Sequence, residues 1–237
     1  MPQIKQKPSR NFAKICSVFS YFIPSVIISN SNRAIAYHRN YGYSKKKFNL
    51  IFNGFDSQIL KKNSNLREKL RSEFKIKKDD FIIGNIARWD PQKDQNNLLK
   101  AFSLIPNKKK IKLFLLGENI SKQNVHLMNL IKKYDIKKDE IILHEQTDRV
   151  YDILNIFDLS VISSVGESFP NAIPESMLME IPVISTRVGD IENVINNSTG
   201  WICEPEKSYE LKNKIVFAME EFESKKTKWL QRKNNCR

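Results

Sequence analysis

The chain has 237 residues, of which 41% are apolar and 28% are charged, and its formal net charge is +14. This length suffices for one large domain or for one domain plus a fragment, and the apolar share can fill a core. No window reaches the roughly 18 uninterrupted apolar residues that a transmembrane helix needs. The composition therefore excludes a membrane-spanning chain, and we expect a soluble one.

The number and spacing of the cysteines indicate where the protein is located and whether it holds disulfides or zinc. Cys16, Cys203 and Cys236 are an odd number at wide spacing with no CxxC pair, so neither a disulfide framework nor a zinc site is indicated. The apolar run at 15–28 is broken by serines and a proline and has no small-residue cleavage site close behind it. We therefore expect a cytoplasmic protein.

The positive charge is concentrated in the first third of the chain. Residues 1–80 hold 17 Lys and Arg against 5 Asp and Glu, whereas residues 81–237 hold 23 against 21. Such a segment attracts anionic lipid head groups, phosphorylated substrates or nucleic acid, or it consists of solvated lysine turns. No motif of a nucleic-acid-binding module accompanies the charge, so nucleic acid is not an expected partner. A peripheral contact with the inner face of a membrane stays open.

Residues 1–80 predict too few elements for a complete doubly wound domain. Helices are expected near 11–22, 33–41 and 67–74, and strands near 26–29 and 49–52. This is a single βαβ-sized piece, whereas a doubly wound domain needs two βαβαβ halves. We assign residues 1–50 to a remnant of another domain and residues 51–80 to a connecting segment.

From residue 81 onward, short apolar runs alternate with amphipathic stretches. Strands are predicted at 81–87, 112–116, 140–143, 159–163, 182–186 and 200–203, with helices around 97–102, 125–134, 150–155, 171–179 and 209–222. Strands joined through helices are parallel, and their continuous Ile, Leu, Val and Phe runs indicate burial on both faces. We predict an α/β fold, with a doubly wound, Rossmann-like domain at 81–222 and a polar tail at 223–237.

Two cations follow the first of these strands. Ligands of open parallel sheets bind beyond the carboxyl ends of the strands where strand order reverses, and the first and fourth strands flank that point. Arg88 and Lys93 follow the first strand and precede a helix. A guanidinium fork and a mobile ammonium at one strand end suit a diphosphate.

The loop after the fourth strand supplies the rest of the predicted site. Gly166 is expected to allow a sharp turn, and Pro170 or Asn171 to open the next helix, whose free N–H groups suit a phosphate. Glu175 can accept hydrogen bonds from ribose hydroxyls, and Glu167 is expected nearer the sugar of the nucleotide. Two glutamates also fit the acid and base of a glycoside hydrolase, but the cations and the phosphate-friendly helix start favour a nucleotide.

These motifs occur in an order that resembles the retaining glycosyltransferases of family 4. They are Asn53-Gly54-Phe55-Asp56, Gly84-Asn85-Ile86-Ala87-Arg88 with Lys93, Leu115-Leu116-Gly117, Gly166-Glu167-Ser168-Phe169-Pro170-Asn171 with Glu175-Ser176-Met177, Pro182-Val183-Ile184-Ser185-Thr186, and Val188-Gly189-Asp190-Ile191-Glu192. Seven residues separate Glu167 from Glu175, as in the two-glutamate motif of that family. The correspondence covers roughly residues 25–222.

The resemblance implies a GT-B enzyme that transfers a sugar, with retention, from a nucleotide-diphosphate sugar to a glycan or lipid-linked acceptor, in polysaccharide or glycolipid synthesis. Residues 81–222 would hold the donor, and residues 1–50 would be a remnant of the acceptor domain. Neither a metal nor another cofactor is implied. The implied catalytic residues are Arg88 and Lys93 at the diphosphate and Glu167 at the donor sugar. The implied substrate-binding residues are Glu175 at the ribose, together with Gly166, Ser168, Phe169, Pro170, Asn171, Asn53 and Gly54.

The chain departs from the family pattern in its first third. Only the last helix, strand and helix of an acceptor domain are expected, and His38, His126 and His144 match no position at which the family places a histidine near the donor. Three hypotheses stay open: a working enzyme completed by a partner chain or a second copy, a truncated chain that binds nucleotide sugar without transferring it, and a sugar-nucleotide epimerase.

Overall fold

The structure is a computed structural model that describes residues 10–196 and 198–224. These residues divide into two compact units, the smaller ending at Gly54 and the larger beginning at Phe55. The segment expected as a connection at 51–80 is therefore split, because residues 55–80 belong to the larger unit.

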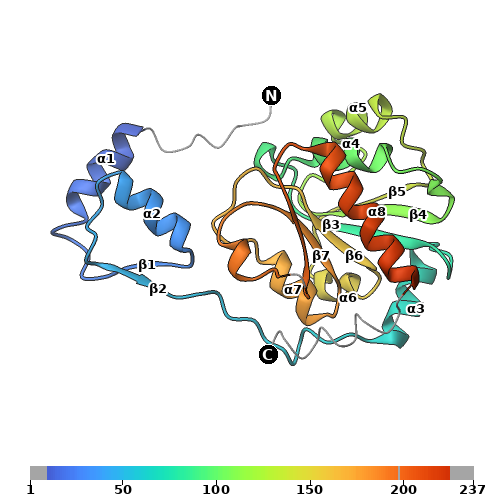
Figure 1. Cartoon of the computed structure of the whole chain (residues 1–237), viewed down its shortest axis with the longest axis horizontal. Coiled ribbons are helices and arrows are strands. Elements are labelled where there is room, and N and C mark those ends of the chain that lie inside the picture. The colour runs from blue at the N-terminus through green and yellow to red at the C-terminus, as the bar shows by residue number, and fades with distance from the viewer. Residues whose placement is uncertain (1–9, 197, 225–237) are drawn as a thin grey trace. The chain divides into compact units, whose positions relative to one another are not determined.

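The smaller unit is a βαβ piece preceded by one helix (Figure 1). It contains α1 (Arg10–Phe19), β1 (Ile27–Ser29), α2 (Asn32–Asn40) and β2 (Phe48–Leu50), and β1 pairs with β2 in parallel. The hydroxyl of Ser31 caps α2 by accepting a hydrogen bond from the N–H of Ala34 at 3.2 Å. The predicted βαβ unit is confirmed.

The larger unit contains a parallel six-stranded sheet. Its strands are β3 (Phe81–Ile86), β4 (Ile111–Leu116), β5 (Ile141–His144), β6 (Leu159–Ile162), β7 (Val183–Thr186) and β8 (Gly200–Cys203). They lie in the order β5-β4-β3-β6-β7-β8, so strand order reverses between β3 and β6, the first and fourth strands of this unit. The predicted doubly wound sheet is confirmed.

Helices cover both faces of this sheet (Figure 1). The first layer comprises α4 (Gln95–Ser103), α5 (Val125–Lys133) and α8 (Ser208–Ser224), and the second comprises α3 (Ser64–Glu73), α6 (Val150–Leu154) and α7 (Ala172–Leu178). Side chains alternate along each strand, so Ile83 packs under the first layer and Ile82 under the second, both fully buried. The polar tail predicted from residue 223 begins inside α8, and residues 225–237 lie outside the described residues.

Helix α3 belongs to the larger unit because two arginines fasten it to the sheet. Arg67 donates from Nη2 to Asp158 Oδ1 at 2.6 Å and from Nη1 to the carbonyl of Asn155 at 2.7 Å. Arg71 lies 3.6 Å from the same aspartate, and Leu70 between them is fully buried. Asp158 is about 90 positions away in sequence. No local sequence pattern could therefore predict that α3 is bound to it.

Candidate functional site

The site forms at the carboxyl ends of β3 and β6, where two loops are hydrogen-bonded to each other. After β3 the chain runs into the short 3₁₀ helix η1 (Pro91–Lys93), which Asp90 caps by accepting from the N–H of Gln92 at 2.8 Å. After β6, the N–H of Val165 donates to the carbonyl of Gln92 at 2.8 Å, and the hydroxyl of Ser163 donates to the carbonyl of Lys93 at 2.8 Å. These bonds fix the two loops against one another at the point where strand order reverses.

A pocket of about 290 Å³ opens between these loops. Three of the predicted charged residues, Lys93, Glu167 and Glu175, share its wall. The complete lining is Asn85, Ile86, Ala87, Lys93, Ile162, Ser164, Glu167, Phe169, Pro170, Asn171, Ala172 and Glu175. The fold thus brings groups that are 82 positions apart in sequence, Lys93 and Glu175, to one cavity.

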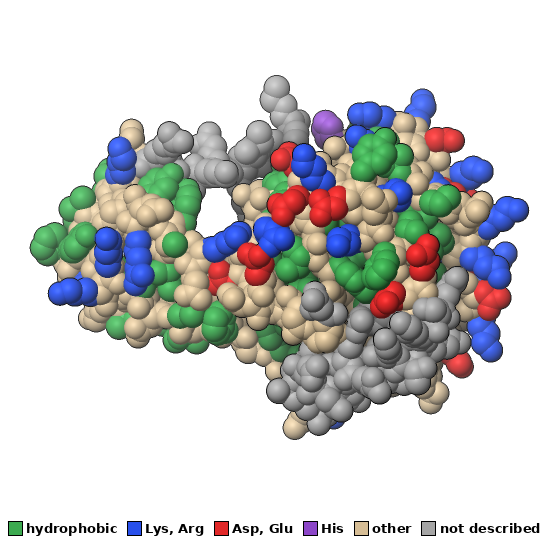
Figure 2. Space-filling model, in the orientation of Figure 1, with side chains coloured by type: hydrophobic (Ala, Val, Ile, Leu, Met, Phe, Trp, Pro, Cys, Tyr) green, Lys and Arg blue, Asp and Glu red, His purple; other side chains and the backbone are tan. Residues whose placement is uncertain are grey.

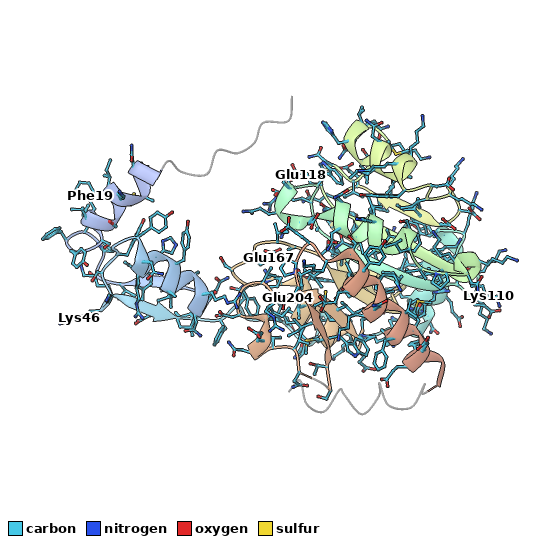
Figure 3. The ribbon with its side chains drawn as sticks, turned by 45° about the horizontal axis from the view of Figure 1, so that its top comes forward. Phe19, Lys46, Lys110, Glu118, Glu167 and Glu204 are labelled. Atoms are coloured by element: carbon cyan, nitrogen blue, oxygen red, sulfur yellow. The ribbon has the colours of Figure 1, made fainter. Side chains whose placement is uncertain are left out.

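Two residues of this lining, Lys93 and Glu167, form an ion pair. Lys93 Nζ donates to Glu167 Oε1, and the hydroxyl of Ser164 donates to the same oxygen at 2.8 Å. The two charged side chains are only 20% and 13% exposed, so their attraction is screened less than that of a surface pair. Figure 3 shows Glu167 on the loop at this end of the sheet. The ammonium of Lys93 is therefore held at the cavity wall, where it can bind a second anion.

Glu175 lies in the first turn of α7, and its carboxyl group has a raised pKa. Burial raises the pKa of Glu175, and a hydrogen bond from the hydroxyl of Tyr151, at 3.4 Å, opposes that rise. Burial favours the protonated form because it removes water from the charged one. Donors on a bound molecule would restore the charged form, so this carboxyl is suited to accept from hydroxyl groups.

Arg88 is directed away from this set. Its side chain is 53% exposed and pairs with Asp90, with Nε 3.1 Å and Nη2 3.0 Å from Oδ2 of that residue. It is not among the residues that line the pocket. Of the two cations expected at a diphosphate, the structure thus places Lys93 in the cavity wall and pairs Arg88 with the partly buried carboxylate of Asp90.

Two glycines of the site differ in their surroundings and in their backbone conformation. Gly166, which was expected to allow a sharp turn, has a φ outside the left-handed region, and an added Cβ there would meet nothing within 4 Å. Gly189 instead has φ +54°, and a Cβ there would lie 2.4 Å from the carbonyl oxygen of Ser168. The close approach that shapes the Glu167 loop is therefore made by Gly189, because only glycine fits there without strain.

Other predicted site residues are placed as follows. Phe169, Pro170 and Asn171 line the pocket, whereas Gly166 and Ser168 are on the same loop outside the lining. Asn53 and Gly54 belong to the smaller unit, where Asn53 Oδ1 accepts a hydrogen bond from Asn30 at 3.2 Å.

Asn85 and Tyr151 are site residues that sequence reasoning missed. Asn85 is 2% exposed, donates from Nδ2 to the carbonyl of Val161 at 2.8 Å, and leaves Oδ1 without a partner among the described residues. A polar residue in an otherwise apolar strand was the signal for Asn85. Tyr151 gave none, because its contact with Glu175 spans 24 positions.

No group of three or more His, Cys, Asp and Glu side chains that could hold a metal occurs within the described part of the chain. The charged groups of the pocket are the one ammonium and the two carboxylates. This lining can bind an anion at Lys93 and hydroxyl groups at the two glutamates.

The topology and the pocket together define a doubly wound α/β domain with its polar site at the strand-order reversal. A family model described as glycosyl transferases group 1 matches residues 66–233. The chain belongs to this family, and the resemblance inferred from its motifs is confirmed.

Curated relatives are longer than this chain. It is 28% identical over 160 residues to N-acetyl-alpha-D-glucosaminyl L-malate synthase of Bacillus anthracis, and 27% identical over 144 residues to the capsular polysaccharide biosynthesis glycosyltransferase CapM of Staphylococcus aureus. The matches cover 67% and 60% of this chain but only 41% and 37% of the relatives. The chain thus spans about two fifths of their length.

Solved structures share the fold of the chain. HepE from Anabaena, in complex with UDP and glucose, matches with a TM-score of 0.86 and 21% identity, over 96% of this chain and 62% of HepE. WaaG, a glycosyltransferase involved in lipopolysaccharide biosynthesis, matches with a TM-score of 0.77 and 16% identity, over 88% of this chain and 57% of WaaG. At these identities the likeness shows the fold, which is that of GT-B glycosyltransferases.

Proposed function

We propose that the larger unit binds a nucleotide-diphosphate sugar and that the chain serves the transfer of that sugar, with retention, to a glycan or lipid-linked acceptor in polysaccharide or glycolipid synthesis. One observation carries the proposal: Lys93, Glu167 and Glu175 line a single pocket at the strand-order reversal. Family membership and the UDP complexes of HepE support it.

The ammonium of Lys93 would neutralise the diphosphate as it leaves. Breaking the bond between the sugar and the diphosphate places negative charge on the leaving phosphate oxygen, and a fixed cation stabilises that charge as it develops. Glu167 holds this ammonium at the cavity before the donor arrives. On binding, the ammonium would be shared between Glu167 and the diphosphate, and no metal would be needed for this role.

Arg88 would supply a second positive charge by leaving Asp90. Its side chain is half-exposed and its pair with Asp90 is close to the surface, and such pairs are worth about 1 kcal/mol or less. A diphosphate offers the guanidinium a stronger, doubly charged acceptor. The change is therefore favourable once the donor is in place.

The two glutamates would bind hydroxyl groups at opposite ends of the donor. Glu175 would accept from the ribose, which stabilises the charged form that burial disfavours. Glu167 would accept from the transferred sugar through the oxygen that is not held by Lys93 and Ser164. Gly166 has open space where a side chain would be, so the donor sugar can approach its backbone.

Calorimetric titration with UDP, GDP and their sugars tests donor binding. Changing Lys93 to Met should weaken diphosphate binding by about 1.5–3 kcal/mol, the range for hydrogen bonds to charged groups, whereas Lys132→Met, an exposed lysine on α5, should leave it unchanged. Equal affinity of both variants and the parent would remove Lys93 from the site.

An assay of released nucleoside diphosphate separates the open hypotheses. Release that depends on an added acceptor identifies a working transferase, and binding without release identifies a chain that holds the donor only. Conversion of the bound sugar to its epimer, with no nucleotide released, would contradict transfer and favour an epimerase.

A further inference from the structure

Asp90 lies in sequence between the two cations that follow β3, Arg88 and Lys93. The two oxygens of its carboxylate have separate partners. Oδ1 accepts from the N–H of Gln92 at 2.8 Å and so caps η1. Oδ2 accepts from Nε and Nη2 of Arg88 at 3.1 and 3.0 Å. One side chain therefore shapes the loop with one oxygen and holds the guanidinium with the other.

The carboxyl group of Asp90 is ionised at neutral pH. Burial acts to raise its pKa, but the hydrogen bond from Gln92, the hydrogen bond and charge of Arg88, and the charge of Lys93 hold the pKa below its ordinary value. The negative charge therefore acts on both cations that we propose for the diphosphate. A diphosphate that enters the pocket has to compete with this carboxylate for the guanidinium.

The backbone at Arg88 is fixed, so that only the side chain can change its place. Gln95 Nε2 donates to the carbonyl of Arg88 at 2.8 Å, and Gln95 is itself only 2% exposed. The N–H of the next residue, Trp89, donates to the carbonyl of Glu118 at 2.8 Å; Glu118 is labelled in Figure 3. A change of partner by the guanidinium is therefore a rotation of one side chain on a rigid support.

An exposed ion pair by itself indicates no function. Figure 2 shows acidic and basic side chains next to each other on the visible face of the larger unit. The pair of Arg88 and Asp90 differs by its place, because Ala87, the residue before Arg88, lines the pocket. The guanidinium is half-exposed, so its rotation toward the pocket breaks only a pair near the surface.

We propose that Asp90 is a positioning residue that competes with the diphosphate for Arg88 and thereby speeds the release of the nucleoside diphosphate after transfer. The inference rests on the proposed function, because it needs a diphosphate beside Lys93. Before the donor binds, Asp90 keeps the guanidinium out of the pocket. When the product leaves, the carboxylate takes the guanidinium back. Tight binding of donor and product alike gives no gain in turnover once the donor is abundant, whereas faster release of the product does.

Calorimetric titration with UDP and with inorganic pyrophosphate tests the competition. Asp90→Asn is the informative change, because the amide oxygen can still accept from Gln92 and cap η1 while the negative charge is gone. The variant should bind both ligands about threefold to fivefold more tightly, the range that corresponds to an ion pair near the surface. Asp90→Ser, which also leaves a capping residue without charge, should give the same gain.

The rate of dissociation gives a second measurement. Since the guanidinium turns to a ligand that is already in the pocket, the tighter binding should appear as slower dissociation. A stopped-flow chase of fluorescently labelled UDP with unlabelled UDP should show the label leaving Asp90→Asn more slowly than the parent by about the same factor as the gain in affinity.

A double-mutant cycle with Arg88→Met shows whether Asp90 acts through Arg88. In the Arg88→Met background, Asp90→Asn should give much less of the gain that it gives in the parent. Asp79→Asn is the matched control, because it removes the same charge from the amino end of β3, where Asp79 forms an exposed pair with Lys110. It should leave UDP affinity unchanged.

Failure of this inference and failure of the proposed function give different results. A parent that binds neither UDP nor pyrophosphate would remove the proposed function and the inference with it. A parent that binds UDP, beside an Asp90→Asn protein with the same affinity and the same dissociation rate, would overturn the inference alone. An equal gain with and without Arg88 would also overturn it, because Asp90 would then act only as a negative charge near the pocket.

Discussion

Replacing Gly189 by alanine should disturb the candidate site, because the new methyl group would displace the loop that carries Glu167. The added Cβ would lie 2.4 Å from the carbonyl oxygen of Ser168 and 2.9 Å from that of Glu167, both inside normal contact distance. The loop would have to retreat by about half an ångström or more, since cores have no free space to absorb an extra methyl group.

The expected loss of folding stability in the Gly189→Ala variant has two parts. Alanine at φ +54° costs about 1–2 kcal/mol relative to a right-handed conformation, and relief of the contact adds roughly 1 kcal/mol, at the low end for overpacking. A loss of about 2–3 kcal/mol lowers Tm by roughly 4–12 °C in a chain of this length. Because the loop carries Glu167, the transfer proposed for this chain should also slow by up to about 10²-fold, the scale for an ångström of misplacement.

Thermal unfolding followed by circular dichroism measures the loss of stability. UDP titration measures the pocket, and the assay of released nucleoside diphosphate measures the transfer rate. Gly166→Ala is the matched control for stability, because its Cβ would meet nothing within 4 Å and its φ is not left-handed. It should leave Tm unchanged or raise it slightly through the unfolded chain. A Gly189→Ala protein that melts within 1 °C of the parent and binds UDP equally well would refute the close approach described here.

Three further outcomes are expected. Burial raises the pKa of Glu175. Between its ordinary pKa and the raised one, the folded chain holds more protons than the unfolded chain, so stability falls as pH rises through that window. The Glu175→Gln variant should therefore melt at a higher temperature than the parent at pH 8 and at the same temperature at pH 4. Arg67→Met should cost about 2–3 kcal/mol in urea unfolding, because it leaves the largely buried Asp158 without its 2.6 Å partner, and an unchanged urea midpoint would count against that anchor. Burial raises the pKa of the Cys203 thiol to about 12, so this cysteine should resist iodoacetamide at pH 8 until the chain is unfolded, as peptide mass mapping can show.

Sequence patterns specify the elements of the larger unit because each pattern is local. Continuous apolar runs marked the six strands to within one residue at each end, since a strand covered on both faces has no polar side to keep. The intervening amphipathic stretches implied parallel crossovers, and the order of motifs implied the family. The polar loops at 88–93 and 163–175 stood out because charged and proline-rich residues follow buried strands there.

Which residues meet in the site was decided by contacts between distant positions. Lys93 pairs with Glu167 across 74 positions, whereas Arg88 pairs with Asp90 two positions away. Both cations follow the same strand, and sequence treated them alike. Lys93 and Arg88 differ only in the direction of their side chains. That direction depends on which carboxylate the packing of the chain places close to each cation.

The sequence by itself determined an α/β chain of the glycosyltransferase type, with its charged loops at one end of a parallel sheet. The tertiary structure decided that α3 belongs to the larger unit, that Gly189 makes the close approach to the Glu167 loop, and that Lys93 rather than Arg88 lines the pocket. Periodicity states which side of a helix is apolar, but the packing of the neighbouring chain decides which side is buried. In α3, the side that faces the sheet carries Arg67 and Arg71, which Asp158 binds although it lies about 90 positions away in sequence.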